Sequence, residues 1–343
     1  MMRAAVVPRY SIMEVADFPV PTIKREGDLL VRMHRASICG SDVHTLFDGL
    51  LNPDRLGRPG YPGHEGVGEV VDSRSPEFPI GTRLLTVPTG AIGGCFAEYQ
   101  LISQTRVVPL PTDGDMERLL MAQQYGTTLY AMRTFWPGDG STGISTGTAA
   151  VIGAGSAGLF FLQQLKQLGF DNVVVSDLNA QRLEVARLQG ADVVLDAETG
   201  SLPEATLDLT DGQGADLVIE AAGYDSCRAD AITAVRPFGT VGYFGLPERF
   251  GTAEFPMYEA FRKAVRIQWA GKTQEEPGLT SFRDAIRHIQ EGRIDVEYCL
   301  GSVFGIEELP QAMEIAREHG NGAVKLSIDL ADAHVQKELR APS

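Results

Sequence analysis

Two short stretches in the first third of the chain carry side chains that could bind a metal ion. The first runs from Cys39 to His44 with the sequence C-G-S-D-V-H, and the second, G-H-E-G, contains His64 and Glu65. A thiolate, an imidazole and a carboxylate on glycine-bordered turns are good ligands for Zn²⁺, which prefers sulfur and nitrogen donors. Taken alone, each stretch is more often a buried cysteine or a structural histidine than a metal ligand, so both interpretations stay open at this point.

A third stretch has the pattern of a nucleotide-binding turn. Gly153, Gly155 and Gly158 form G-A-G-S-A-G between an apolar run at 149–152 and an amphipathic segment. Such glycines allow a tight turn, approach of the backbone to a pyrophosphate, and close packing of helix on strand. Asp177 lies 19 residues beyond Gly158 at the end of the next apolar run, where a carboxylate can accept hydrogen bonds from ribose hydroxyls. The alternative is a glycine-rich turn without a ligand, which the strand, helix, strand and terminal aspartate in register disfavour.

The composition excludes several classes of protein. The chain has 343 residues, of which 22% are charged and 43% hydrophobic, an ordinary globular composition with room for two domains. Its net charge is −15 and it has no lysine or arginine cluster, so we expect no nucleic-acid binding. No apolar run of membrane-spanning length and no signal segment occurs, and four widely separated cysteines predict no disulfide framework. We therefore expect a cytoplasmic protein that does not enter a membrane.

The first 110 residues are predicted to be rich in β-strands. Short alternating apolar runs occur at 28–33, 67–71 and 83–87, and glycines and prolines separate them. This texture is typical of a compact, twisted antiparallel or barrel-like domain. A helical pattern in this region is limited to about 41–46, and a longer helix is expected at 116–135.

Strand and helix patterns alternate in the middle of the chain, which predicts a doubly wound parallel sheet covered on both faces. The expected strands are 149–152, 173–175, 193–195, 216–221, 240–244 and 265–269. After residue 272 the texture changes again, to helical patterns at 279–291 and 306–317 and a last strand at 323–328. We expect the first and last segments, 1–122 and 273–343, to form one domain, with a Rossmann domain at 123–272 inserted between them.

Together these motifs resemble the zinc-dependent medium-chain dehydrogenase/reductase superfamily of alcohol, polyol and glucose dehydrogenases. The order and spacing of C-G-S-D-x-H, G-H-E-G-x-G, GxGxxG and the ribose aspartate match that family. Similar stretches at 94–99, 218–223 and 322–325 extend the resemblance over nearly the whole chain. It implies an α/β fold with a GroES-like β-rich catalytic domain and a Rossmann domain. It also implies hydride transfer between an alcohol and a nicotinamide cofactor, with zinc polarising the substrate oxygen.

The resemblance carries roles to particular residues. Cys39 and His64 match the two invariant zinc ligands, and Glu65 matches a neighbouring carboxylate that can ligate the metal transiently. Asp42 would orient a ligating histidine. Ser41 and His44 match a proton relay to bulk water.

The chain departs from the family pattern in two places. Residues 83–89 run almost directly into 93–96, which leaves no room for the lobe of four cysteines that holds a structural zinc in alcohol dehydrogenases. We therefore expect one catalytic zinc and no structural zinc. The third protein ligand, usually a cysteine or glutamate, corresponds to Gln123, whose amide oxygen is a weaker, neutral ligand.

The resemblance also implies a cofactor site, formed by Gly153, Gly155, Ser156, Gly158, Asp177 and Arg182. The Asp177 carboxylate would repel the 2′-phosphate of NADP, and Leu178 and Asn179 supply no positive charge to hold it. Arg182 is placed to flank the adenine. We therefore favour NAD(H) over NADP(H).

The sequence leaves the substrate open, although a polyol, sugar or cyclitol is favoured. Polar candidates for the substrate pocket are Asp48, Gln100, Gln124 and Glu259, and apolar candidates are Phe47, Tyr125, Tyr258 and Trp269. A zinc-independent quinone or enoyl reductase of the same fold and a non-catalytic NAD-binding protein remain as alternative functions. We expect a homodimer or homotetramer.

Overall fold

The chain divides into two compact units in the computed structural model, which describes residues 1–50, 52–90, 92–137 and 146–331. The first unit comprises Met1–Gly126, Gln274–Asn321 and the chain from Lys325 onward. The second comprises Thr127–Thr273 together with Gly322–Val324. The chain thus leaves the first unit, forms most of the second, and returns.

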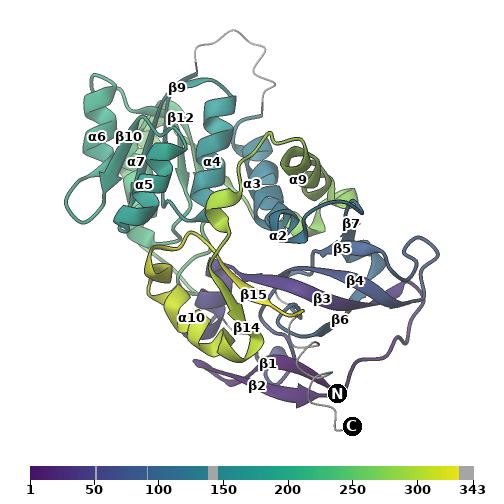
Figure 1. The fold of residues 1–343 in the computed structure, drawn as a ribbon. Coiled ribbons are helices and arrows are strands. Elements are labelled where there is room, and N and C mark those ends of the chain that lie inside the picture. The colour runs from purple at the N-terminus through teal and green to yellow at the C-terminus, as the bar shows by residue number, and fades with distance from the viewer. Residues whose placement is uncertain (51, 91, 138–145, 332–343) are drawn as a thin grey trace. The chain divides into compact units, whose positions relative to one another are not determined.

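The first unit is built on a seven-stranded sheet in the order β14-β15-β3-β4-β5-β7, with β6 also paired to β3 (Figure 1). Its strands are β3 (Asp28–Ile38), β4 (Glu65–Ser73), β5 (Arg83–Thr86), β6 (Tyr99–Ser103), β7 (Val107–Pro109), β14 (Val303–Gly305) and β15 (Leu326–Asp329). All pairs are antiparallel except β14 with β15. A hairpin of β1 (Met2–Arg9) and β2 (Ile12–Phe18) completes the β-rich unit. The predicted strands at 28–33 and 67–71 are confirmed within β3 and β4, and the strand predicted at 83–87 corresponds to β5 but ends one residue earlier, at Thr86.

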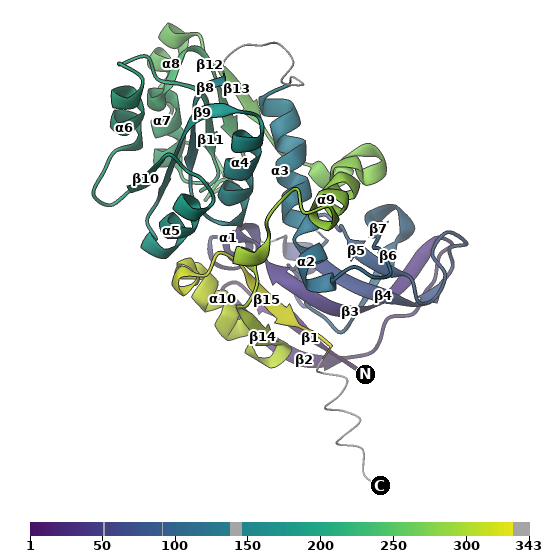
Figure 2. The same cartoon turned by 45° about the horizontal axis from the view of Figure 1, so that its top comes forward.

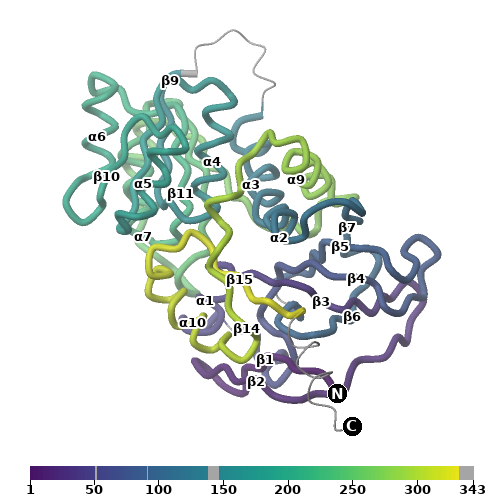
Figure 3. The backbone as a smooth tube through the Cα atoms, viewed as in Figure 1, coloured from purple at the N-terminus to yellow at the C-terminus, as the bar shows by residue number. Residues whose placement is uncertain are grey.

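The last strand of this sheet, β15, starts later than the sequence predicted. Figure 3 shows β15, in yellow, beside the purple β3, and the two strands pair from Leu326 with Ile38 to Asp329 with Arg35. The prediction placed the start of this strand at residue 323. It begins at Leu326 because Gly322–Val324 belong to the second unit, where Nε and Nη2 of Arg182 donate to the Ala323 carbonyl at 3.1 and 3.0 Å.

The helices of the first unit are α1 (Gly40–Phe47), α2 (Met116–Leu120), α9 (Thr280–Gln290) and α10 (Leu309–Arg317). The single helix predicted at 116–135 is interrupted at Met121, whose N–H donates to the Arg118 carbonyl at 3.1 Å in a tighter, 3₁₀-type turn. Helix α3 (Ala122–Phe135) follows and passes from the first unit into the second.

The second unit is a six-stranded parallel sheet in the order β10-β9-β8-β11-β12-β13 (Figure 2). The strands are β8 (Thr146–Ile152), β9 (Phe170–Asp177), β10 (Val193–Asp196), β11 (Ala215–Glu220), β12 (Val235–Tyr243) and β13 (Arg266–Trp269). Successive residues of the central strands, such as Val218 and Ile219, are both buried, so the sheet is covered on both faces as predicted. The strand order reverses between β8 and β11, which is where ligands bind in sheets of this topology.

Helices connect these strands: α4 (Ser156–Gln167), α5 (Ala180–Leu188), α6 (Leu202–Leu209), α7 (Asp225–Ala234) and α8 (Met257–Lys263). The sequence analysis missed α6, whose eight residues are too few for a clear apolar period. Its start signals were nevertheless present, because the Ser201 side chain caps the Glu204 N–H and Pro203 lies in the first turn.

Candidate active site

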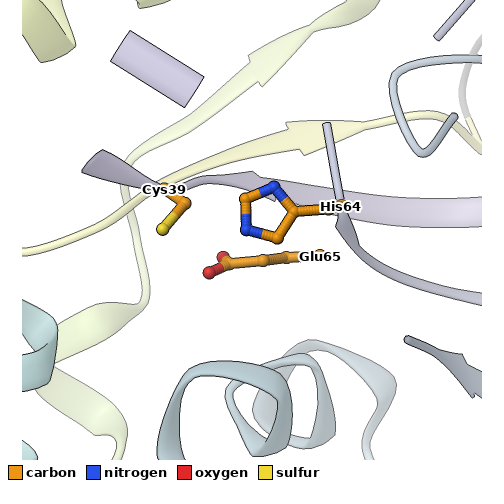
Figure 4. Close-up of side chains that lie close together, drawn as sticks. All are labelled: Cys39, His64 and Glu65. Carbon is orange, nitrogen blue, oxygen red and sulfur yellow. The ribbon is translucent and has the colours of Figure 1, made fainter. Parts of the chain in front are cut away.

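Three potential metal ligands meet where two paired strands of the first unit end. Cys39 follows β3 and caps the N-terminus of α1, while Glu65 begins β4 directly after His64. Because β3 and β4 pair with Ser37 opposite Glu65, these positions are neighbours. One ligand atom from each of Cys39, His64 and Glu65 lies within 4.8 Å of the others, and Figure 4 shows their side chains facing one another.

Asp42 fixes the orientation of His64. Its Oδ1 lies 3.0 Å from Nδ1 of His64, and its Oδ2 accepts the backbone N–H of Cys39 at 2.9 Å. Nε2 of His64 is therefore the nitrogen left for a metal, with the Ser41 hydroxyl 3.4 Å away. Burial alone would lower the pKa of His64, but the charge and hydrogen bond of Asp42 raise that pKa well above its usual value. A metal must displace this proton in order to bind.

Glu65 is fully buried and forms an ion pair with a buried lysine. Nζ of Lys325 lies 2.6 Å from Oε2 of Glu65, with side-chain exposures of 2% and 1%, and the Ser37 hydroxyl donates to the same oxygen. Burial would raise the pKa of Glu65, but the Lys325 ammonium and His64 lower it, so the carboxylate is charged. Its Oε1 has no hydrogen-bond partner within the described ranges. The thiol, imidazole and free carboxylate oxygen form a donor set that fits zinc.

The two neighbouring glutamines of α3 point to different partners. Nε2 of Gln123 donates to the backbone carbonyl of His64 at 3.4 Å. Oε1 of Gln124 lies 3.9 Å from Sγ of Cys39 and accepts from Nζ of Lys325 at 3.2 Å. Ligation by Gln123 stays a prediction, and Gln124 is the amide whose oxygen faces the cluster. The sequence analysis considered Gln124 only as a substrate contact.

The two expected relay residues both lie on α1. Ser41 is beside the imidazole of His64, and Nδ1 of His44 is 2.5 Å from Oδ2 of Asp48. Asp48, which the sequence suggested as a substrate contact, instead partners His44. The spacing of four residues, with Asp48 as the C-cap of α1, was the signal for this pair.

Cys95 and Cys227 lie outside this cluster of potential ligands. Burial raises the pKa of Cys95 to about 12 and that of Cys227 to about 11, so both thiols are protonated. In the described part of the chain, Cys39, His64 and Glu65 are the only group of three or more such side chains placed to hold a metal.

The nucleotide-binding turn of the second unit has the expected form. Gly153 has φ +99°, and a Cβ on Gly158 would lie 1.8 Å from the Gly153 carbonyl oxygen, so both positions require glycine. Gly155 caps α4, and Ser156 is the first residue of that helix. Asp177 ends β9, and its Oδ2 accepts the N–H of Ala154 at 2.6 Å.

Several residues that the sequence analysis suggested for the cofactor site or the substrate pocket make other contacts within the protein. The guanidinium of Arg182 is held by the Ala323 carbonyl, and burial lowers the pKa of this arginine. Nε2 of Gln100 donates a hydrogen bond to the Gly93 carbonyl, and Glu259 accepts one from the Thr233 hydroxyl, so both polar side chains already have partners. The remaining suggested pocket residues divide into buried Phe47 and Tyr125 and exposed Tyr258 and Trp269.

A parallel sheet with a glycine-rich turn, joined to a β-rich unit that carries a Cys-His-Glu cluster, is typical of two-domain, nucleotide-dependent oxidoreductases. In the described residues no helix is both long and apolar enough to cross a membrane.

Comparison with known families agrees with this class. Residues 25–112 match the alcohol dehydrogenase GroES-like domain and residues 157–289 match the zinc-binding dehydrogenase domain, together more than half of the chain. The chain therefore belongs to the zinc-type alcohol and polyol dehydrogenases of the medium-chain dehydrogenase/reductase superfamily.

Two distant relatives and one solved structure align with this chain over almost their full length. The chain is 24% identical to a sorbitol dehydrogenase of Bacillus subtilis, covering 95% of this chain and 97% of the relative. It is 28% identical to an L-threonine 3-dehydrogenase of the same species, covering 91% and 94%. A solved alcohol dehydrogenase from Thermus matches with a TM-score of 0.80 at 24% identity, covering 96% of this chain and 99% of that structure, which supports the fold.

Proposed function

We propose that this protein is a zinc-dependent oxidoreductase that transfers hydride between an alcohol and NAD, interconverting the alcohol with its ketone or aldehyde. The observation that carries this proposal is the convergence of Cys39, His64 and the unpaired Oε1 of Glu65 at one point. A family whose members are zinc-type dehydrogenases supplies the reaction class.

Some residues of the first unit would hold the metal, and others would transfer a proton. Cys39 and Nε2 of His64 would hold the ion, with Glu65 and a glutamine amide as further ligands. Bound zinc polarises the substrate oxygen, and the nicotinamide ring exchanges the hydride. When an alcohol is oxidised, the Ser41 hydroxyl would accept the substrate's proton as it releases its own, and His44, oriented by Asp48, would pass a proton to solvent.

We propose NAD as the preferred cofactor because of the residue that ends β9. Asp177 presents a carboxylate where the adenosine ribose is expected, and a carboxylate there repels a 2′-phosphate. Nε and Nη2 of Arg182 already donate to the Ala323 carbonyl, which supports a role of this side chain beside the adenine and not in an ion pair with a 2′-phosphate.

We propose a polyol, sugar or cyclitol as the substrate class. The relatives include a sorbitol dehydrogenase, and solved structures of the same fold include a galactitol-1-phosphate dehydrogenase from Escherichia coli. Gln124 beside Cys39 supplies a polar group next to the proposed metal position.

We also propose a division of the chain into two domains. Residues 1–122 and 273–343 would form the catalytic domain and residues 123–272 the dinucleotide-binding domain. A homodimer or homotetramer and a cytoplasmic location stay predictions.

Exposed apolar side chains on α8 and the edge strand β13, including Phe261 and Trp269, support assembly with a second copy. Light scattering after size exclusion measures the assembly directly.

Turnover assays test the proposal against both alternatives. Zinc-loaded protein is mixed with NAD⁺ or NADP⁺ and a panel of alcohols, polyols and cyclitols, and the absorbance of the reduced cofactor is followed. The proposal expects oxidation with NAD⁺ that chelation abolishes. Turnover of quinones or enoyl compounds without metal would favour the zinc-independent reductase, and cofactor binding without any turnover would favour a non-catalytic protein.

A further inference from the structure

Glu220 is fully buried in the second unit, and the mechanism above gives it no role. It is the last residue of β11, and the Ala221 N–H that follows it donates to the Ile152 carbonyl of β8 at 2.9 Å. Because the strand order reverses between β8 and β11, Glu220 lies at the edge where dinucleotides bind in such sheets. A carboxylate buried there is costly unless its charge and its oxygens are compensated.

Glu220 holds two turns at once. Its Oε1 accepts the N–H groups of Ala222, at 2.7 Å, and Gly223, both in the turn after β11. Its backbone carbonyl accepts the N–H groups of Phe244 at 2.9 Å and Gly245 at 3.1 Å, in the turn after β12. One residue therefore connects the carboxyl ends of two neighbouring strands.

Arg228 on α7 holds the same two turns through their carbonyl groups. Its Nη2 donates to the carbonyls of Gly223 at 2.9 Å and Gly245 at 3.3 Å, and its Nη1 donates to Asp225 at 2.9 Å. Nε of Arg228 lies 3.9 Å from Oε2 of Glu220, and the two side chains are 8% and 0% exposed. Neither of these two atoms has a hydrogen-bond partner in the described structure, so each is compensated by the charge of the other.

The turns held in this way touch each other and the nucleotide-binding turn. A Cβ on Gly245 would lie 2.3 Å from the Gly223 nitrogen, and a Cβ on Gly153 would lie 3.3 Å from the Ala222 nitrogen. In such close packing, a shift of the turn after β11 displaces both neighbours.

We propose that Glu220 and Arg228 are a positioning pair that holds the turns at 221–223 and 244–246 in the conformation that receives the nicotinamide half of the dinucleotide. The inference rests on the proposed nicotinamide cofactor. A dinucleotide lies across the strand ends on both sides of the reversal point. Asp177 at the end of β9 marks the adenosine side, so the turns after β11 and β12 lie on the opposite side, under the other half.

Two variants of the full chain separate positioning from simple stability. Glu220→Gln removes the charge opposite Arg228 but keeps the shape, and Arg228→Lys keeps the charge but loses the fork that reaches both carbonyls. Dissociation constants are measured by fluorescence for NADH and by competition for AMP, which carries only the adenosine half. We expect both variants to bind NADH about tenfold more weakly, the loss of roughly one hydrogen bond to a charged group, and AMP within about twofold of wild type.

Asp216→Asn is the matched control, because Asp216 lies on the same strand near its other end. Asp216 accepts from Nε of Arg236 at 2.7 Å and from the Thr148 N–H at 3.0 Å. This variant should melt at a lower temperature than wild type and bind both ligands normally.

Three results would overturn the proposal. Unchanged NADH binding by Glu220→Gln and Arg228→Lys would overturn the role of the pair while leaving the proposed function intact. Equal weakening of NADH and AMP would show a general loss of the unit instead of positioning. A wild-type protein that binds neither NADH nor NADPH would overturn the proposed function, and this role with it. If Glu220→Gln does not fold, Arg228→Lys carries the same test.

Discussion

The substitution Lys325→Met removes the positive charge that compensates Glu65 and nearly preserves the volume of the side chain. The two groups are 2.6 Å apart with side-chain exposures of 2% and 1%, so the variant leaves a carboxylate buried with only the Ser37 hydroxyl as a donor. Removing one partner of a buried ion pair typically costs about 3–5 kcal/mol. We expect the metal-free variant to lose this amount of unfolding free energy at neutral pH.

The pH dependence of this loss has a defined sign. In the wild type, burial would raise the pKa of Glu65, but Lys325 lowers it overall. The ion pair therefore stabilises the fold at pH values above the normal pKa of glutamate. That contribution disappears as the pH falls through the lowered pKa. In Lys325→Met only burial and the remaining neighbours act, so Glu65 takes up a proton more readily and the stability difference between the proteins narrows on acidification.

Urea unfolding of the metal-stripped full chain at pH 7, followed by fluorescence, measures the effect. Zinc should restore much of the lost stability, because a cation beside Oε1 again compensates the carboxylate. The control is Lys166→Met, whose lysine lies 2.9 Å from Asp192 with side chains 32% and 35% exposed, and which should cost about 0–1 kcal/mol. A metal-free Lys325→Met variant as stable as the control would refute the reasoning, and so would a loss that zinc leaves unchanged.

The remaining predictions concern the metal and the cofactor. Cys39→Ser or His64→Ala should abolish turnover and zinc binding but leave the NADH dissociation constant unchanged by titration, since cofactor and metal groups lie in different units. Asp42→Asn should weaken zinc binding about 10–100-fold in a metal-competition assay, because it removes the charged acceptor that orients His64; unaltered affinity would contradict this role. Asp177→Ala should lower kcat/KM for NAD about 10–100-fold and narrow the preference over NADP, whereas an unchanged ratio would remove the basis for NAD.

Motifs with short local spacing were predictable from the sequence. Gly153 and Gly158 are required by a positive φ and by a close approach of helix to strand, and both requirements are local to one turn. The pairing of Asp42 with His64 was likewise implied by family motifs that occur close together. The alternating strands of the parallel sheet followed from buried apolar runs.

Contacts between distant segments were not predictable in the same way. Lys325 is 260 positions from Glu65 in the sequence, and neither its place in an apolar strand pattern nor the family resemblance at 322–325 indicated which residue it would pair with. Which of the neighbouring residues Gln123 and Gln124 faces Cys39 depends on the rotation of α3 about its own axis. The order and spacing of the motifs predict where the helix lies in the sequence, but they do not predict this rotation.

Metal content measured on the same preparation as turnover tests the central claim most directly. The full chain is purified with zinc present, quantified by elemental analysis, and assayed for alcohol oxidation with NAD⁺ before chelation, after it, and after zinc is added back. We predict one zinc per chain, loss of turnover in proportion to its removal, and recovery on addition, because one ligand cluster occurs among the described residues. Full turnover by protein that contains no zinc would contradict the account.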